Sequence, residues 1–146
     1  YVMEKEGKSV GEIMESLNKK SGFLGVSKLS SDSRDIEDAI KAGNEQAILA
    51  QKMFVNSVVK YISQYYVEMG GCDVLAFTAG IGENSISTRA EIVEQLACLG
   101  IKLDVEANNV RGELTCISSS DSNSLVYLVP TNEELMIAMD TLALIK

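Results

Sequence analysis

Residues 73–92 carry the pattern that most limits how this chain can fold. The apolar run DVLAFT ends in a turn that contains Gly80 and Gly82, and a helix-like pattern then begins. A short apolar run of this kind is typical of a strand buried in a parallel sheet. Glycine permits positive φ and lets a ligand approach the backbone closely, and N–H groups at a helix start can face an anion. The segment therefore predicts a strand–turn–helix unit.

Neither of the two common phosphate-binding loops fits this turn. The Walker pattern requires Gly-Lys-Ser/Thr, and here Gly82 is followed by Glu83. The dinucleotide pattern requires a third Gly or Ala where Ser85 stands. From spacing alone, a ligand-binding turn and a purely structural strand-to-helix turn stay equally open.

Helix signals occur along most of the chain. Apolar residues at helical spacing predict helices over 9–22, 36–43, 44–68, 88–99 and 131–144. Three capping boxes support these starts, because Ser or Thr is followed three residues later by Glu: Ser9–Glu12, Thr88–Glu91 and Thr131–Glu134. The Gly- and Ser-rich segment 22–35 predicts a loop with a short extended piece.

Short apolar runs between the helices predict strands over 73–78, 100–104, 112–118 and 124–130. Because helices and strands interleave, the chain is expected to form an α/β layer architecture. The helix at 44–68 carries two adjacent apolar stripes, which indicates a central element that packs against two layers. One stripe is open to a partner subunit, although an internal core is the simpler interpretation.

Composition excludes several classes of protein. The 146 residues are 46% hydrophobic and 23% charged, as in soluble globular domains. The net charge of −8 and the lack of a basic stripe argue against binding nucleic acid. No apolar run approaches the roughly 20 residues of a membrane helix. The chain neither begins with Met nor carries a signal pattern, and it opens inside an amphipathic segment, so we expect it to continue a longer protein.

Histidine and cysteine limit the chemistry further. The sequence has no histidine, which excludes an imidazole base, a Ser-His triad and a His-ligated metal within this chain. Its three cysteines, Cys72, Cys98 and Cys116, are widely spaced without a CxxC pair. They predict reduced, mostly buried thiols in a cytoplasmic protein.

Two further positions are candidates for a site. Arg34, one of only three arginines, follows Asp32 and Ser33. In one interpretation, Arg34 stacks on a base or pairs with a phosphate. In the other, Asp32 or Ser33 caps a short helix and the Arg34 side chain lies in solvent. If Glu134 completes a capping box, Glu133 is left as a spare carboxylate at a strand-to-helix junction. Such a carboxylate suits Mg²⁺ or simply the positive end of the helix dipole.

Five ordered blocks resemble the acetate kinase family: SGFLGVS, SSDSRDIE, FTAGIGENS, LGIKLD and VPTNEELMIA. The resemblance extends over essentially the whole chain. That family belongs to the sugar kinase, Hsp70 and actin superfamily, in which two RNase H-like lobes close over ATP and a small carboxylate. The resemblance thus implies an RNase H-like α/β fold with helices layered on a mixed sheet. Residues 1–146 would form the C-terminal part of the nucleotide-binding lobe, and the N-terminal lobe would lie outside them.

The same resemblance assigns binding roles. The family's adenine-pocket element falls on Asp32, Ser33 and Arg34. The turn that lies against the nucleoside falls on Ala79 through Asn84, namely Ala79, Gly80, Ile81, Gly82, Glu83 and Asn84. The glutamate associated with Mg²⁺ or Mn²⁺ falls on Glu133, and no catalytic residue falls in this chain. Two residues depart from the family pattern: Ser33 replaces a larger apolar residue, and Ala79 replaces a glycine, so its methyl group calls for a negative φ.

The implied activity is reversible phosphoryl transfer between ATP and acetate, giving ADP and acetyl phosphate, by a cytoplasmic homodimer. In the family, the residues that stabilise the transferring group lie upstream of the position of Tyr1. Residues 1–146 alone are therefore expected to be inactive. The alternatives are a propionate or butyrate kinase, and a non-catalytic nucleotide-binding or dimerisation module.

Overall fold

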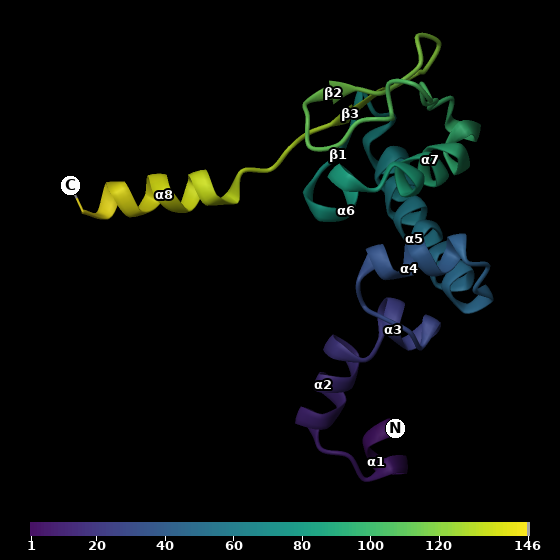
Figure 1. The fold of residues 1–146 in the computed structure, drawn as a ribbon, viewed down its shortest axis with the longest axis vertical. Coiled ribbons are helices and arrows are strands. Elements are labelled where there is room, and N and C mark those ends of the chain that lie inside the picture. The colour runs from purple at the N-terminus through teal and green to yellow at the C-terminus, as the bar shows by residue number, and fades with distance from the viewer. Residues whose placement is uncertain (146) are drawn as a thin grey trace. The chain divides into compact units, whose positions relative to one another are not determined.

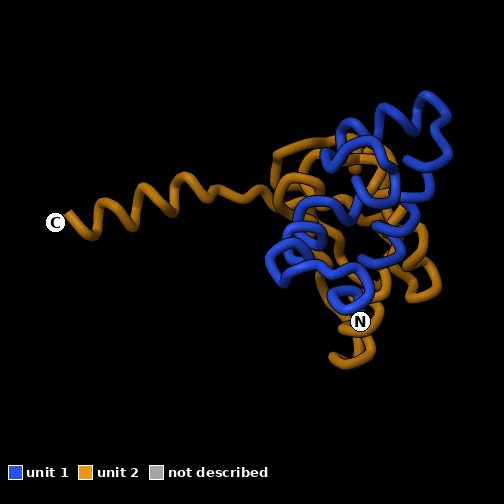
Figure 2. Tube along the Cα trace, turned by 90° about the horizontal axis from the view of Figure 1, so that it is seen from below, with its two compact units in different colours: residues 1–58 blue, residues 59–146 orange. Residues whose placement is uncertain are grey.

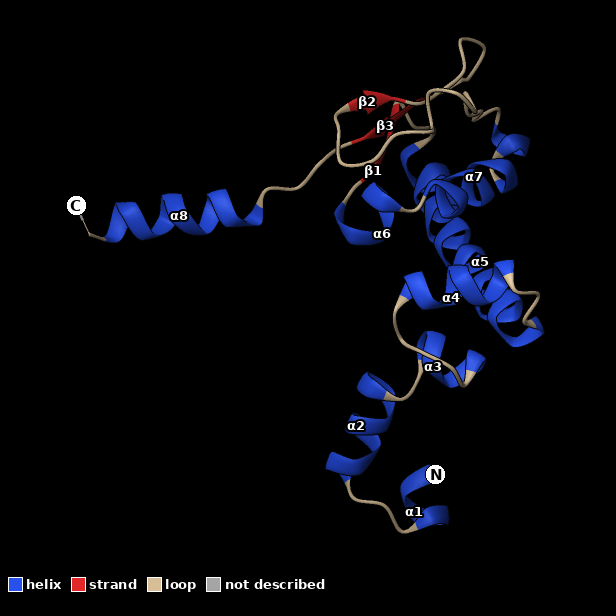
Figure 3. Ribbon diagram, viewed as in Figure 1, coloured by secondary structure: helices blue, strands red, loops and turns tan. Residues whose placement is uncertain are grey.

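A computed structural model describes residues 1–145, and the chain divides into two compact units, residues 1–58 and 59–146 (Figure 2). The first unit is helical, and the second combines a sheet with helices (Figure 3). The helix α5 begins in the first unit and ends in the second.

The first unit contains four short helices and the first half of α5 (Figure 1). Their bounds are α1 Val2–Glu6, α2 Val10–Lys19, α3 Gly22–Ser27, α4 Ser33–Lys41 and α5 Glu45–Met69. The predicted capping box at α2 is confirmed, because Ser9 and Glu12 bond to each other's backbone N–H groups. The helix ends at Lys19 rather than at the expected Gly22.

The segment expected to be a loop forms the helix α3 instead. Gly22 has φ +59° and opens the helix, and Lys28 in the left-handed region (φ +57°) closes it. The ring of Phe23 lies 5.1 Å from that of Phe54 on α5. This aromatic contact with a distant segment is absent from local sequence statistics, and it favours the helical conformation over the propensity of Gly and Ser.

The helix α5 forms where the periodicity predicts it, whereas α4 begins three residues before the predicted 36–43, within the segment expected to be a loop. Gly43, with φ +80°, separates them, and Gly70 and Gly71 follow α5, both with positive φ. The buried α5 side chains lie in its first half: Ala47 and Ala50 in one predicted stripe, Val55 in the other, and Gln51 in neither. Tyr61, further along the stripe of Ala47 and Ala50, is 62% exposed in this chain.

The second unit is built on a three-stranded mixed sheet. The strands are β1 Val74–Phe77, β2 Thr115–Cys116 and β3 Leu125–Leu128, in the spatial order β1-β3-β2. β1 runs parallel to β3, and β2 runs antiparallel to it. Since Phe77 pairs with Leu128, the segments that follow β1 and β3 leave the same end of the sheet. This is the edge where α/β folds place ligands.

The connection from β1 to β3 carries the remaining short elements, α6 Ala79–Asn84, α7 Ile86–Gln95 and the 3₁₀ helix η1 Ala97–Leu99. Buried apolar side chains from this connection and the sheet form the core of the unit: Phe77, Ile92, Val93, Leu96, Ile101, Ile117, Val126 and Leu128. The strand expected over 100–104 is reduced to one bridge between Leu103 and Ser118.

The N-cap of α7 lies three residues before the predicted one, Thr88. The Ser85 hydroxyl accepts from the Thr88 N–H (3.2 Å) and donates to the Thr88 hydroxyl (2.7 Å). Ser85 therefore is the N-cap, and Thr88 lies within the helix. Ser85 and Thr88 are both residue types that cap helices, and the capping-box pattern wrongly predicted Thr88.

The last helix, α8 Glu133–Leu144, forms where it is predicted, and all its side chains are exposed in this chain.

No helix within residues 1–145 combines the length and the hydropathy that crossing a membrane would require. All three cysteines are free, as expected, but the expectation of burial is wrong, because Cys98 and Cys116 are exposed and Cys72 is intermediate.

Candidate functional site

The glycine turn is a single short helix, α6, placed directly after β1. Its six residues end at Asn84, whose side-chain amide donates to the Gly80 carbonyl (2.9 Å). Thr78 precedes it in extended conformation without capping it through its side chain. The sequence thus predicted the strand–turn–helix order, and the turn itself adopts helical geometry.

The left-handed residue of this segment is Ala79, with φ +59°. This contradicts the expectation that Ala79 has a negative φ, and neither Gly80 nor Gly82 uses the positive φ that glycine permits. A non-glycine residue there costs about 1–2 kcal/mol. The strand-to-helix reversal needs one left-handed residue, and in this chain the strain falls on an alanine.

The two glycines have different surroundings. A Cβ atom at Gly82 would lie 3.2 Å from the carbonyl carbon of Phe77, so this glycine lets α6 pack against β1. A Cβ atom at Gly80 would meet nothing within 4 Å, and Gly80 is exposed. Gly82 is therefore required by the fold, whereas Gly80 offers open backbone that a ligand can approach.

The β3–α8 junction differs from the predicted capping box. Asn132 is the N-cap, and its Oδ1 accepts from the Leu135 N–H (2.9 Å). Both Glu133 and Glu134 lie in the first turn, so the elimination that singled out Glu133 does not hold. Asparagine is a better N-cap than threonine, and Thr131 has a different partner.

Thr131 bonds to Glu83 on α6. The Thr131 N–H (2.9 Å) and hydroxyl (2.8 Å) both donate to Glu83 Oε1. These bonds, the backbone one first, lower the pKa of the Glu83 carboxyl. A contact across 48 residues thus brings the glycine turn and the junction of Glu133 together at one end of the sheet.

The junction has the donor chemistry of a magnesium site. An open polar depression of about 440 Å³ is lined by Thr131, Asn132, Glu133 and Glu134, which offer carboxylate, amide and hydroxyl oxygens. Residues 1–145 contain no cluster of three His, Cys, Asp or Glu side chains suited to a metal. The two carboxylates of the depression, Glu133 and Glu134, match the number through which Mg²⁺ is held when water and substrate phosphates supply its other ligands.

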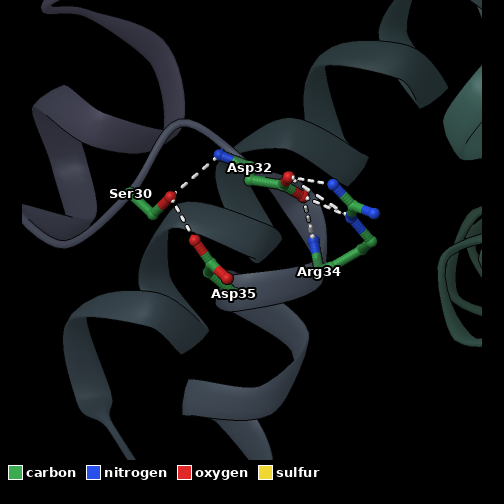
Figure 4. A network of polar contacts seen from close by, with 4 residues as sticks. All are labelled: Ser30, Asp32, Arg34 and Asp35. Atoms are coloured by element: carbon green, nitrogen blue, oxygen red, sulfur yellow. Dashed lines mark hydrogen bonds and ion pairs between the residues drawn. The ribbon is translucent and has the colours of Figure 1, made fainter.

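Arg34 lies at the first turn of α4 in the other unit (Figure 4). Asp32 is the N-cap and accepts from the Arg34 N–H (2.9 Å). The Arg34 guanidinium also donates to both carboxylate oxygens, with Nη2 2.6 Å from Oδ2 and Nε 3.0 Å from Oδ1. The Ser30 hydroxyl accepts from the Asp32 N–H (3.1 Å) and donates to Asp35 (2.6 Å).

This arrangement matches the structural alternative for Arg34, a side chain in solvent beside a capped helix. The Arg34 side chain is 87% exposed. Its hydrogen bonds, followed by that from the Arg34 N–H, lower the pKa of Asp32 from 3.8 to about 2. An exposed guanidinium held in one orientation is also a group that can stack on an aromatic ring.

Arg89 is a residue that sequence analysis counted without assigning a role. Its side chain is fully buried, although it follows α6 by only five residues. Nη1 donates to the carbonyls of Gly82 (2.9 Å) and Glu83 (3.1 Å). The only hint in the sequence was the rarity of arginine, which does not distinguish a buried residue from an exposed one.

The sequence of this chain matches a known protein family and its members. A model of the acetokinase family matches residues 1–139. This chain belongs to the acetokinase family. The acetate kinase of Treponema denticola is 54% identical over 146 residues, and the match covers all of this chain and 37% of that protein.

Solved structures of the family share the fold. The acetate kinase of Porphyromonas gingivalis matches 99% of this chain and 37% of its own, with a TM-score of 0.89 and 48% identity. A propionate kinase from Francisella tularensis matches 94% of this chain and 35% of its own, with a TM-score of 0.86 and 38% identity. The α/β fold class is therefore confirmed, and the chain spans little more than a third of the length of its relatives.

The Asp32–Arg34 pair generates a prediction about titration. Arg34→Gln is expected to raise the pKa of Asp32 from about 2 toward 3.8, because the Arg34 side chain is the largest cause of the shift. The pair's contribution to stability is present above about pH 4 and is lost as the pH falls toward 2, since the folded-state pKa is the lower one. An NMR titration of the Asp32 carboxyl carbon measures this, with Lys41→Gln, at the other end of α4, as control. A pKa that stays near 2 in Arg34→Gln would contradict the assignment.

The two glycines of α6 generate a second prediction. Gly82→Ala is expected to lower the free energy of unfolding by roughly 1–3 kcal/mol, since the new methyl group presses on Phe77. Gly80→Ala is expected to be neutral or stabilising by up to about 1 kcal/mol, because the space is open and alanine favours a helix. Urea denaturation of the two variants tests the difference. Equal destabilisation by both would show that Gly80 is also required for packing.

Proposed function

We propose that this chain is the carboxy-terminal part of an acetate kinase and forms part of its nucleotide-binding lobe. The observation that carries the proposal is the 54% identity over 146 residues to an acetate kinase. The remainder of such an enzyme, including the N-terminal lobe, would lie outside residues 1–146. The complete protein would transfer the γ-phosphoryl group of ATP reversibly to acetate.

The site geometry supports a division of roles among this chain's residues. Arg34, oriented by Asp32 and accompanied by Ser33, would stack on the adenine. Exposed backbone at Gly80 would approach the nucleoside, with Ile81, Gly82, Glu83 and Asn84 shaping the turn around it. With the chain carrying a net charge of −8, local donors rather than the overall field must hold an anionic ligand.

Glu133 would hold Mg²⁺ or Mn²⁺ through its carboxylate, directly or through water. When bound, the ion neutralises charge on the β- and γ-phosphates. Two features support this role for Glu133: it occupies the position of the family's metal-associated glutamate, and it lines a polar depression whose Thr131 bonds to Glu83 on α6. Glu134 lies one residue further along the same first turn.

The chemistry explains why a chain without histidine suffices for this lobe. An acetate oxygen attacks the γ-phosphorus, and the bond from that phosphorus to the bridging oxygen of ADP breaks. Acetate is a carboxylate at neutral pH and needs no general base to remove a proton. Catalysis then depends on positioning and on charge stabilisation. The groups that stabilise the transferring phosphoryl would lie outside residues 1–146.

Propionate is the competing acceptor, because a propionate kinase shares the fold at 38% identity. The P. gingivalis acetate kinase is closer, at 48% identity, which favours acetate. A kinase that consumes ATP and acetate would act in the cytoplasm. A homodimer is also proposed, with the exposed part of the predicted α5 stripe, including Tyr61, as one surface available to a second copy.

The complete protein containing this chain is expected to form acyl phosphate from ATP and carboxylate, trapped as the hydroxamate with hydroxylamine. We expect kcat/KM for acetate to exceed that for propionate by about 10-fold or more, the effect of one methylene in a fitted pocket. Residues 1–146 alone are expected to give no product. Absence of product with acetate, propionate and butyrate from the complete protein would leave only the non-catalytic nucleotide-binding or dimerisation module. Product from residues 1–146 alone would contradict the proposed position of the catalytic groups.

A further inference from the structure

The side chain of Arg89 is fully buried, and all five of its N–H donors are used. Besides the Gly82 and Glu83 carbonyls, it donates to the side chain and carbonyl of Asn108 (2.8 and 2.9 Å) and to the Val110 carbonyl (2.7 Å). No carboxylate of residues 1–145 is among the acceptors of Arg89. Burial, and secondarily Arg111, lower the pKa of Arg89, but a guanidinium titrates too high to lose its charge at neutral pH.

Arg89 fixes the end of α6. The last carbonyls of a helix have no partner within the helix, and they form the negative end of its dipole. The Arg89 guanidinium binds two of these carbonyls and joins them to the loop at 108–110. The Glu83 carbonyl is therefore fixed by a side chain that is buried within the unit.

The side chain of Glu83 points to a second partner. Its Oε1 accepts both Thr131 donors, at 2.9 and 2.8 Å, and Thr131 lies two residues before Glu133. Glu83 is therefore held at two points, by Arg89 through its carbonyl and by Thr131 through its carboxylate. One of its two carboxylate oxygens, Oε1, therefore accepts two hydrogen bonds from the protein itself.

We propose that Glu83 is a positioning residue that ties the nucleoside turn to the junction bearing Glu133, rather than a direct contact of the nucleotide. Without this tie, each half keeps its own structure: Arg89 still holds α6, and Asn132 still caps α8. Removal of the Glu83–Thr131 bonds would instead remove the direct link between α6, which carries Gly80, and the junction that carries Glu133. The tie thus couples binding of the metal to binding of the nucleotide. The inference rests on the proposed function.

Equilibrium binding of fluorescent N-methylanthraniloyl-ADP to the complete protein tests the tie, with Mg²⁺ and with EDTA. The measured quantity is the factor by which Mg²⁺ strengthens nucleotide binding. Glu83→Ala is expected to reduce this factor by about 3- to 10-fold, as for loss of a hydrogen bond to a charged group near the surface. Thr131→Val, which keeps its N–H, is expected to reduce it less. In both variants, the loss of nucleotide affinity in EDTA is expected to be smaller than the loss with Mg²⁺ present.

The matched control is Glu94→Ala, which removes an exposed carboxylate from α7 in the same unit and is expected to leave the factor unchanged. A thermal melt of each variant accompanies the binding curves, because a general loss of structure would weaken binding equally with and without Mg²⁺. That pattern would overturn the proposal.

Three other results would overturn it as well. If Glu83 contacts the nucleotide directly, Glu83→Ala weakens binding in EDTA and Thr131→Val has no effect. If the factor is unchanged in both variants while the unmodified protein binds Mg²⁺ and ADP, the tie has no role and the proposed function stands. If the unmodified protein binds no ADP in any condition, the proposed function itself fails, and the inference fails with it.

Discussion

The buried guanidinium of Arg89, which has no carboxylate among its acceptors in residues 1–145, makes the interactions on which the candidate site depends. Burying a charge is costly unless all its polar groups are bonded, and Arg89 meets this condition with four backbone carbonyls and one amide oxygen. Two segments, the end of α6 and the loop at 108–110, must hold their conformations for those five bonds to exist. The six-residue helix α6 is too short to be stable by itself. Its geometry is therefore imposed by Arg89 and by the packing of Gly82 on Phe77.

The parallel pairing of β1 and β3 determines which parts of the chain meet. Because both strands run in the same direction, α6 and the start of α8 follow the same end of the sheet. The bonds between Glu83 and Thr131 then link these two connections directly. An open turn and a pair of carboxylates thereby become neighbours, although 48 residues separate Glu83 from Thr131. The strongly acidic chain offers an anionic nucleotide no general attraction, so the proposed nucleotide binding would depend on such local arrangements and on a metal ion.

Sequence reasoning succeeded where one local signal was unopposed and failed where two signals competed. The Ser9–Glu12 box, the long periodicity of α5 and the apolar run of β1 had no rival, and each is confirmed. Ser85 and Asn132 replaced the predicted caps Thr88 and Thr131 because several capping residues stood close together. The helix α3 depends on the contact between Phe23 and Phe54, which no local pattern contains. The family resemblance led to the correct fold, but the roles of Arg89 and Thr131 required the side-chain contacts themselves.

The central proposal is that the backbone at Gly80 and the carboxylate of Glu133, joined through the Glu83–Thr131 bonds, hold one magnesium-bound adenine nucleotide. A crystal structure of the complete protein with Mg²⁺ and ADP tests it most directly. The account predicts the nucleoside within van der Waals contact of Gly80, and the metal or its water shell bonded to Glu133. A nucleotide bound elsewhere, with Gly80 and Glu133 both in contact only with solvent, would contradict it.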